Sequence, residues 1–432
     1  MKIILSENLR RKYFVDKKIN EKISIFTQAI TELGNLYKNS KNANVLDTVS
    51  VLAKMIEKYK TSEYDEIMND IYCFLNNNRV LILIDSMDRY DVRATEVVLI
   101  VQSLVEVAFK FYSHVEYNII IKIALPAELS PLFIYKLPEK HQSNTVAIEW
   151  KYKELIKMIA IRFLYYCQEK SNNKDLIELG RKYAIDDFYE NYYAAKNFLL
   201  EFLPEKCPTN ISLHFDTLAY CIRHTQKKPR QLMKVFNMFI QCFLDKENIK
   251  YFHDYPEKIG YYIHRTQRDI IYDTLNMYNN LTENQIVKVC SDALHKKNYI
   301  VTKKEIINSL KEALKKVYKT EDKNNVRLDA EDYFEMIKES GLIGKVYRNS
   351  YVEKNNLWFE NPNILKLIIT LFEYQLKERL PLSDNDQCVL HPMCYEYFEN
   401  YIDYNAFVYP LPIDDEEDID QVDTYLRDLL FD

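Results

Sequence analysis

Glycine is scarce in this chain, which limits both the turns and the ligand-binding loops that the backbone can form. The 432 residues include five glycines, and these are Gly34, Gly180, Gly260, Gly341 and Gly344. Loops that bring the backbone close to a phosphate depend on glycine because it has no Cβ atom. Prolines number 12, so the composition favours long helices with short connections.

The remaining composition is that of a folded protein with more than one domain. Hydrophobic residues make up 47% of the chain, with 35 tyrosines and 21 phenylalanines, whereas disordered chains have few aromatics and a dominant net charge. A domain usually holds roughly 100–200 residues, which predicts two or three domains. The net charge of −6 excludes a polycation, so any contact with DNA must come from a local patch.

The cysteines and the N-terminus indicate a reduced, cytoplasmic protein. The eight cysteines form no C-x-x-C pair and no spacing typical of zinc sites or disulfides, so most of them should be small core residues. The segment after Met1 lacks the apolar core of a signal peptide, and no apolar run reaches about 18 residues. We expect a cytoplasmic location and no membrane partner.

The strongest motif is an apolar run that ends in acidic residues. Val80–Ile84 has the pattern of a parallel strand covered on both faces, and Asp85 follows it directly, with Asp88 three residues later. This is the pattern of a Walker B strand, whose first carboxylate holds Mg²⁺ through water and whose second can orient the attacking water. The simpler alternative is that Asp85 only caps the next helix.

The phosphate-binding loop that normally accompanies such a strand is missing. A Walker A loop, G-x-x-x-x-G-K-[ST], uses glycine N–H groups to approach the phosphates and a lysine to neutralise them. None of the five glycines begins this pattern, and the strand expected at Ile119–Leu125 ends without a polar group that could read a γ-phosphate. The chain is either degenerate or has lost its first strand and loop, and we expect no ATPase activity from it alone.

The other patterns predict a helix-rich α/β protein. A helix at about 92–113 joins the two strands into a strand–helix–strand unit, and a third strand is expected at 145–150. The segments are a helical N-terminal segment at 1–78, an α/β core with a partly truncated parallel sheet at 79–175, a helical lid at 176–265, a winged-helix-like domain at 266–362, and a helical C-terminal segment at 363–432 with an acidic tail at 414–418.

Helix signals outline the winged-helix-like domain. Helices are expected at 268–278, 282–296, 302–318 and 329–340, with capping boxes at Thr282 and Thr302. A hairpin should follow between Gly344 and Phe359, and a further helix should run from 363 to about 377.

Lysines on or beside the helix at 302–318, together with basic residues near the hairpin, could contact DNA phosphates and bases in the major groove. These residues are Lys303, Lys304, Lys311, Lys315, Lys316, Lys319, Lys345 and Arg348. The alternative is a solvated helix face whose charge Glu305, Glu312 and Glu321 partly cancel.

In their order along the chain, the motifs resemble the bacterial P-loop ATPases of the STAND and AAA-like groups. The resemblance covers roughly residues 75–400 and rests on Leu83–Tyr90, Ile148–Trp150 with Glu154-Leu155 and Arg162, and Lys228-Pro229-Arg230.

This resemblance implies ATP and Mg²⁺ as ligands. Asp85 would be the Mg²⁺ carboxylate and Asp88 the water-orienting acid, while Arg162 and Arg230 would contact the nucleotide. It also implies a place in anti-phage defence. A simpler alternative exists for each arginine, because Arg162 could pair with a neighbouring acid and Arg230 could face water.

The sequence thus predicts a degenerate ATPase-like protein with a regulatory or scaffolding role, acting with a protein partner or as a homo-oligomer. Two alternatives stay open: a winged-helix DNA-binding regulator with a non-catalytic α/β scaffold, and an ATPase completed by a P-loop from another subunit. The tyrosine pairs, such as Tyr261-Tyr262, are better explained by core packing than by base stacking. His391 is best explained as a hydrogen-bonded core residue.

Overall fold

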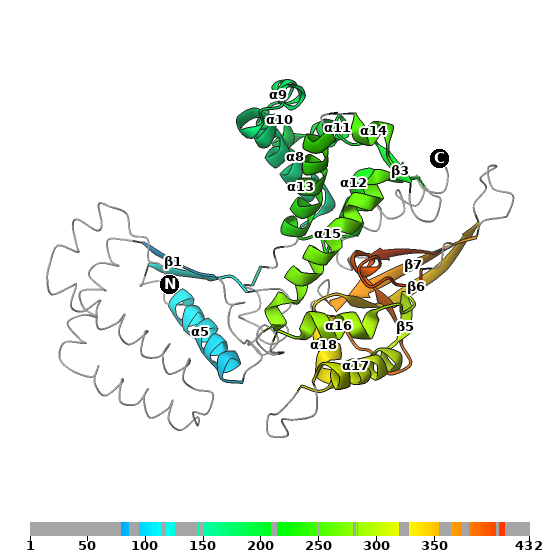
Figure 1. Cartoon of the computed structure of the whole chain (residues 1–432). Helices are drawn as coiled ribbons and strands as arrows, with labels where there is room; N and C mark the ends of the chain where they lie inside the picture. Colours follow the sequence, from blue (N-terminus) through cyan, green and yellow to red (C-terminus); the bar gives the residue numbers. More distant parts are fainter. Residues whose placement is uncertain are drawn as a thin grey trace. The chain divides into compact units, whose positions relative to one another are not determined.

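The chain divides into two compact units, residues 1–83 with 107–122, and residues 84–106 with 123–432. A computed structural model (Figure 1) describes, with gaps of one or two residues, the ranges 79–85, 95–113, 118–125, 145–208, 214–318, 328–353, 364–373, 380–402 and 406–410.

A strand–helix–strand unit forms where the sequence predicts it. Its elements are β1 (Val80–Ile84), α5 (Thr95–Ser113) and β2 (Ile119–Ile123). The Val80 N–H donates to the Asn118 carbonyl at 2.9 Å, and the Ala124 N–H donates to the Ile84 carbonyl at 2.8 Å. The two strands therefore begin together and end together, as in a two-stranded parallel sheet.

This sheet is smaller and more exposed than its apolar sequence predicts. Burial alternates along both strands, and Leu81 and Leu83 remain 53% and 67% exposed, so the prediction of strands covered on both faces is wrong. The third strand expected at 145–150 is also absent at the described positions 145, 146, 148 and 150. Ile148 is 87% exposed there, because a strand forms only where a neighbour pairs with its backbone.

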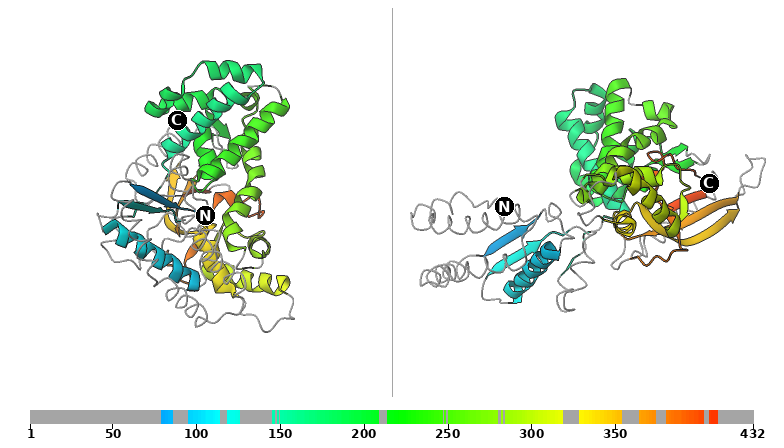
Figure 2. Two further views of the ribbon diagram at one scale, coloured as in Figure 1. Left: turned by 90° about the vertical axis from the view of Figure 1, so that its left-hand side faces the viewer. Right: turned by 60° about the horizontal axis from the view of Figure 1, so that its bottom comes forward.

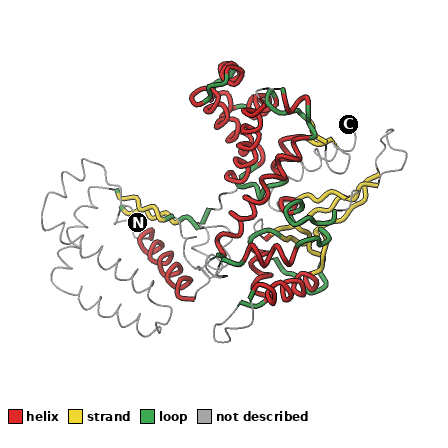
Figure 3. The backbone as a smooth tube through the Cα atoms, in the orientation of Figure 1, coloured by secondary structure: helices red, strands yellow, loops and turns green. Residues whose placement is uncertain are grey.

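Helices dominate the next stretch of the chain, as predicted (Figure 3). They are α8 (Tyr152–Tyr165), η4 (Tyr166–Lys170), α9 (Lys174–Arg181), α10 (Ile185–Glu190), α11 (Tyr192–Leu200), α12 (Thr217–Arg223), α13 (Pro229–Lys246), α14 (Tyr251–Asp254) and α15 (Lys258–Leu275). The short strands β3 (Lys206–Pro208) and β4 (His214–Asp216) pair antiparallel within it. Side chains of Asn173, Asn191 and Asp216 accept first-turn N–H groups and so fix three helix starts.

Three helices and a sheet follow. The elements are η5 (Asn276–Tyr278), α16 (Ile286–Leu294), β5 (Ile300–Thr302), α17 (Lys303–Val317), α18 (Ala330–Glu339), β6 (Ile343–Glu353), β7 (Ile364–Phe372), β8 (Gln387–Leu390), η7 (Pro392–Cys394) and β9 (Ala406–Pro410).

The sheet has the order β5-β8-β6-β7-β9. Its first four strands are antiparallel, and β9 lies parallel to β7. β8 sits between β5 and β6, because Cys388 pairs with Val301 and Val389 pairs with Gly344. β6 and β7 form the long hairpin visible in the right-hand view of Figure 2.

Local helix signals predict most of these boundaries. Thr302 forms the expected capping box with Glu305, and Gly341, with φ at 76°, follows the end of α18. The prediction of a capping box at Thr282 is wrong, because the helix starts at Ile286 and the side chain of its N-cap residue, Gln285, forms no capping hydrogen bond. Asn284 has a φ of 62°, and this left-handed residue turns the chain between Thr282 and the helix.

The prediction of a helix from 363 to about 377 is also wrong, because Ile364–Phe372 forms strand β7. Its three isoleucines suit a pleated strand, and β6 and β9 pair with it on either side. The second strand of the hairpin thus lies later in the chain than expected. Long-range pairing decides this segment, and helical spacing cannot reveal such pairing.

Buried side chains from α8 through β9 form one hydrophobic core. The seven cysteines in the described part of the chain are free and buried, as expected. No helix among the described residues is both long and apolar enough to cross a membrane. The five-segment division of the chain stays a prediction.

Candidate functional site

The predicted Mg²⁺ carboxylate, Asp85, directly follows the carboxyl end of β1 and is exposed. Asp88 lies outside the described residues, so its predicted role stays a prediction. Within the described ranges no group of three or more His, Cys, Asp or Glu side chains is arranged to hold a metal ion.

The two predicted nucleotide-binding arginines are both exposed. Arg162 lies in the last turn of α8, and Arg230 is the second residue of α13. Within the described ranges neither side chain forms an ion pair or hydrogen bond, and neither contacts Asp85. Pro229 begins α13, a favoured position for proline because its missing N–H has no helical partner there.

These residues do not form a complete nucleotide site by themselves. Mg²⁺ bound to a nucleotide takes one or two carboxylates together with the phosphates, and Asp85 can supply one such ligand. The phosphates also need close backbone N–H groups and a lysine, and the sequence has no glycine loop that would provide them. Nucleotide binding at this end of the strand therefore stays a prediction.

Several of the lysines predicted to contact DNA already have acidic partners. The Nζ atom of Lys303 lies 3.6 Å from Glu331, that of Lys315 lies 2.7 Å from Glu312, and that of Lys345 lies 3.0 Å from Asp386. The Ser383 N–H and Lys345 both donate to Asp386 and hold its pKa below the usual range.

The remaining basic residues divide into two groups. Lys304, Lys311 and Lys316 on α17 are exposed and form no ion pair in the described part of the chain. Lys319 and the Arg348 side chain lie outside the described residues. Among the residues that the structure describes, the predicted DNA-contacting lysines without an ion pair therefore all lie on α17, and Lys316 adds to Lys315 in lowering the pKa of the Glu312 carboxylate.

The helix next to the hairpin is α18, and the lysine-rich helix α17 precedes it. Most of α18 is buried, including Tyr333 and Phe334, and its exposed first turn carries Glu331 and Asp332. In helix-turn-helix folds the second helix of the motif enters the major groove. An acidic surface at that place does not suit DNA.

A buried polar cluster escapes sequence analysis. The His224 ring is buried, and its Nδ1–H donates to the Tyr220 carbonyl at 2.8 Å. The Nη1 atom of Arg223 lies 3.5 Å from the Nε2 atom of His224. Arg223 Nε also donates to the Val408 carbonyl at 2.9 Å. The cluster thus ties α12 to strand β9.

Two more histidines extend this cluster. Gln267 donates from Nε2 to His264 Nδ1 at 3.1 Å, since its Oε1 accepts two backbone N–H groups. The Met393 N–H donates to His391 Nδ1 at 3.1 Å, which confirms His391 as a hydrogen-bonded core residue.

All three imidazoles have lowered pKa values. Burial is the largest cause, and the Arg223 charge adds to it. The Lys228 charge also acts on His391, whose pKa falls to about 3. The histidines are therefore neutral inside the core at neutral pH. Their wide separation in sequence leaves no local motif that could predict them.

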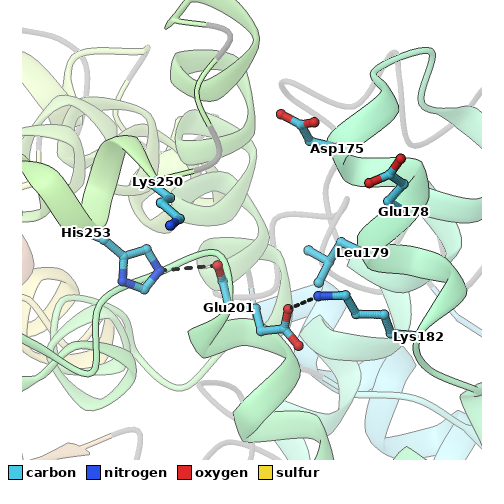
Figure 4. A pocket seen from close by; sticks show the side chains of 7 residues that line it. All are labelled: Asp175, Glu178, Leu179, Lys182, Glu201, Lys250 and His253. Carbon is cyan, nitrogen blue, oxygen red and sulfur yellow. Dashed lines mark hydrogen bonds and ion pairs between the residues drawn. The ribbon is translucent and has the colours of Figure 1, made fainter.

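A surface hollow of about 510 Å³ appears in Figure 4, lined by Asp175, Glu178, Leu179, Lys182, Glu201, Lys250 and His253. Lys182 pairs with the Glu201 carboxylate at 2.7 Å, and His253 Nε2 donates to the Glu201 carbonyl at 3.2 Å. Charges of both signs surround the hollow, so it favours no single charge of ligand and we assign it no function.

Comparison of the chain with models of known families, with curated proteins and with solved structures finds no match. The class of protein that the structure supports is a helix-rich α/β protein with a small parallel sheet and an antiparallel sheet.

Proposed function

We propose that the chain is a degenerate P-loop-ATPase-like protein with a regulatory or scaffolding role, and that anti-phage defence is its setting. The observation that carries this proposal is the incomplete parallel sheet. Asp85 follows the carboxyl end of β1, the edge at which open α/β sheets bind ligands.

The same sheet supports the scaffolding part of the proposal. Parallel sheets are normally covered on both faces, and two strands alone are marginal in water. Leu81 and Leu83 nevertheless stay largely exposed on one face. A second copy or another protein that packs on this face would bury these leucines.

The nucleotide part is tested by calorimetric titration of the purified chain with Mg²⁺-ATP. We expect weak saturable binding without turnover, and weaker binding in Asp85→Ala because a ligand to the metal is lost. Asp186→Ala, at an exposed position on α10, is the matched control. Absence of heat up to about 1 mM nucleotide would remove nucleotide from the proposal and leave the scaffold.

The scaffolding part is tested by measuring the oligomeric state with light scattering. We expect assemblies larger than one chain, and their loss in Leu81→Glu/Leu83→Glu, because the substitutions place charge on the open face. Leu244→Glu, at an exposed leucine of α13, controls for the added charge. A wild-type chain that stays monomeric, or equal behaviour of both variants, would argue against self-assembly through this face.

An ATPase completed by another subunit makes a different prediction. Turnover would then occur only in a mixture with the subunit that carries the P-loop, and Asp85→Ala would abolish it.

A DNA-binding regulator is the second candidate, and the order of elements favours it. Helices α16, α17 and α18 precede hairpin strand β6, which is the order expected for a winged helix, and β5 joins the same sheet through β8, which lies between β5 and the hairpin. Lys304 and Lys311 are exposed without acidic partners. The acidic first turn of α18 weighs against this candidate, which is why we rank it second.

Fluorescence anisotropy with a labelled duplex tests this candidate across a salt series. Each phosphate contact contributes about −0.9 to the slope of log affinity against log salt, so Lys304→Glu/Lys311→Glu should make the slope shallower by roughly 1.8. Lys170→Glu/Lys174→Glu changes two exposed lysines outside α17. Equal slopes for both double variants would exclude DNA contact through α17.

A further inference from the structure

Three cations of the helical region lie over aromatic rings within a short stretch of chain. The Lys246 Nζ lies 5.9 Å from the centre of the Tyr251 ring. The Arg265 guanidinium carbon lies 5.9 Å from the Tyr261 ring, and that of Arg268 lies 5.6 Å from the Tyr272 ring. A cation within about 6 Å of a ring centre is attracted by the π system of the ring.

Two of these pairs form a single stripe along α15. Tyr261, Arg265, Arg268 and Tyr272 follow a spacing of four, three and four residues, which places them on one side of a helix. Tyr261 is 54% and Tyr272 43% exposed, and both arginines are exposed. The opposite side of α15 packs into the core through residues such as Ile263 and Ile270.

The arginines of this stripe are not neutralised by neighbouring acids. Among the described residues neither Arg265 nor Arg268 has an ion-pair partner, in contrast to Lys303, Lys315 and Lys345 elsewhere on the surface. The acids on the same helix are Asp269 and Asp273. Lys234 engages the Asp273 carboxylate at 2.8 Å and also donates to the Asp269 carbonyl at 3.0 Å.

Core packing, which the sequence favours for the pair Tyr261-Tyr262, does not explain Tyr261, because this side chain is exposed. Only its neighbour Tyr262 is packed against the core, whereas the Tyr261 ring remains mostly in water. The Tyr261 ring contacts the edge of Tyr262, with ring centres 5.2 Å apart, and lies beside the Arg265 guanidinium. Such a pair is a feature that binding surfaces use.

We propose that Tyr261, Arg265, Arg268 and Tyr272 bind single-stranded nucleic acid. The guanidinium groups contact phosphates, for which their planar N–H forks are suited, and the tyrosine rings stack on unpaired bases. A duplex would keep its bases stacked on one another and away from the rings. Tyrosine and arginine also occur at the centre of protein interfaces, so a protein partner is the competing occupant that the test must separate from nucleic acid.

The test is fluorescence anisotropy with a labelled pyrimidine oligonucleotide, as DNA and as RNA, and with a duplex of the same sequence. A length of about 20 nucleotides exceeds the usual site sizes of about 4–16 nucleotides. Arg265→Ala/Arg268→Ala should make the salt slope shallower by roughly 1.4, because each single-strand phosphate contact contributes about 0.7. Tyr261→Leu/Tyr272→Leu should weaken binding about tenfold or more at every salt concentration, with the slope unchanged.

Arg181→Ala/Tyr193→Leu is the matched control, since it removes one exposed arginine and one exposed tyrosine from α9 and α11. It should bind like the wild type, and circular dichroism should show all three variants folded. Absence of saturable single-strand binding would overturn the proposal, as would equal affinity for the duplex or full affinity in the tyrosine variant. Binding of a Glu/Tyr peptide in place of the oligonucleotide would identify a protein partner and would also overturn it.

Failure of this test leaves the proposed ATPase-like function untouched. The stripe shares no residue with Asp85 or with the lysines of α17, so the variants report on separate surfaces.

Discussion

Gly344 lies where β6 passes closest to β7, and a side chain there has no room. A Cβ atom on Gly344 would stand 2.5 Å from the Leu371 carbonyl oxygen and 2.6 Å from Thr370 Cγ2. Because the first neighbour is backbone, it cannot move aside without distorting the strand pair. We expect Gly344→Ala to lower the free energy of unfolding by about 1–3 kcal/mol, measured as a lower midpoint of thermal unfolding.

Gly260 in α15 provides a control, because substitution by alanine there is not expected to lower the stability of the protein. A Cβ atom there would meet His264 Nε2 at 3.9 Å and the Tyr220 hydroxyl at 4.0 Å, which are ordinary contacts. Gly260 lies in the first turn of α15, and alanine is favoured over glycine in a helix by up to about 1 kcal/mol, so Gly260→Ala should raise the midpoint or leave it unchanged. A fall with Gly260→Ala as large as that with Gly344→Ala would contradict this explanation.

At the scale of elements, a buried ion group joins α18 to the end of β7. The Lys338 Nζ lies 2.6 Å from Glu335 and 3.5 Å from Glu373, and the side chains of Lys338 and Glu373 are 6% and 5% exposed. Removing one partner of a buried pair costs about 3–5 kcal/mol, because a charge is left in a poorly solvating place. We expect a loss of this size in Lys338→Met, measured by urea unfolding.

A double-mutant cycle separates the pair from its surroundings. Lys338→Met/Glu373→Gln removes both charges, so it should recover much of the stability that Lys338→Met loses. Losses that simply add would show that Lys338 and Glu373 do not stabilise each other.

The elements also show which parts of the fold are readable from sequence. The starts of α17 and α18 and the end of α18 follow from Thr302, Asp329 and Gly341, since capping uses neighbouring residues. Strand β7 was not predictable, because its state depends on β6 and β9, which are distant in sequence.

The same reasoning applies to the candidate site. Asp85 is found from a contiguous motif, and the structure confirms that it follows a strand. The arginine and tyrosine stripe on α15 has a helical period, which the sequence contains. Its exposure could not be read from that period, because an aromatic residue at helical spacing is equally consistent with a core face.

For the whole molecule, the buried histidines make stability depend on pH. In the unfolded chain a histidine takes up a proton near pH 6.5, whereas folding lowers the pKa of His391 to about 3 and those of His224 and His264 in the same direction. The unfolded state therefore binds more protons below about pH 6.5. We therefore expect the free energy of unfolding to decrease as the pH is lowered below about 6.5, by up to about 1.4 kcal/mol per pH unit for each histidine.

Urea unfolding at several pH values between about 6.5 and 5 checks this expectation with a matched pair of variants. His391→Asn keeps an acceptor for the Met393 N–H but cannot take up a proton, so its dependence on pH should be shallower than that of the wild type. His253→Asn, at an exposed ring that hydrogen-bonds to the Glu201 carbonyl, controls for replacing a histidine outside the buried cluster. Equal slopes for the wild type and His391→Asn would show that His391 does not contribute.

The position of β8 between β5 and β6 affects how this protein can be synthesised. Val301 pairs with Cys388, so β5 leaves the ribosome long before its partner has been translated. Helices α8, α11, α13 and α15 contact one another and can begin to pack first, although α12 and α15 also contact residues beyond Gln387, whereas pairings distant in sequence form slowly. During translation, the edges of β5 and β6 are open to other chains, and a nascent protein arrested before Gln387 should keep its helices while its sheet stays vulnerable to aggregation.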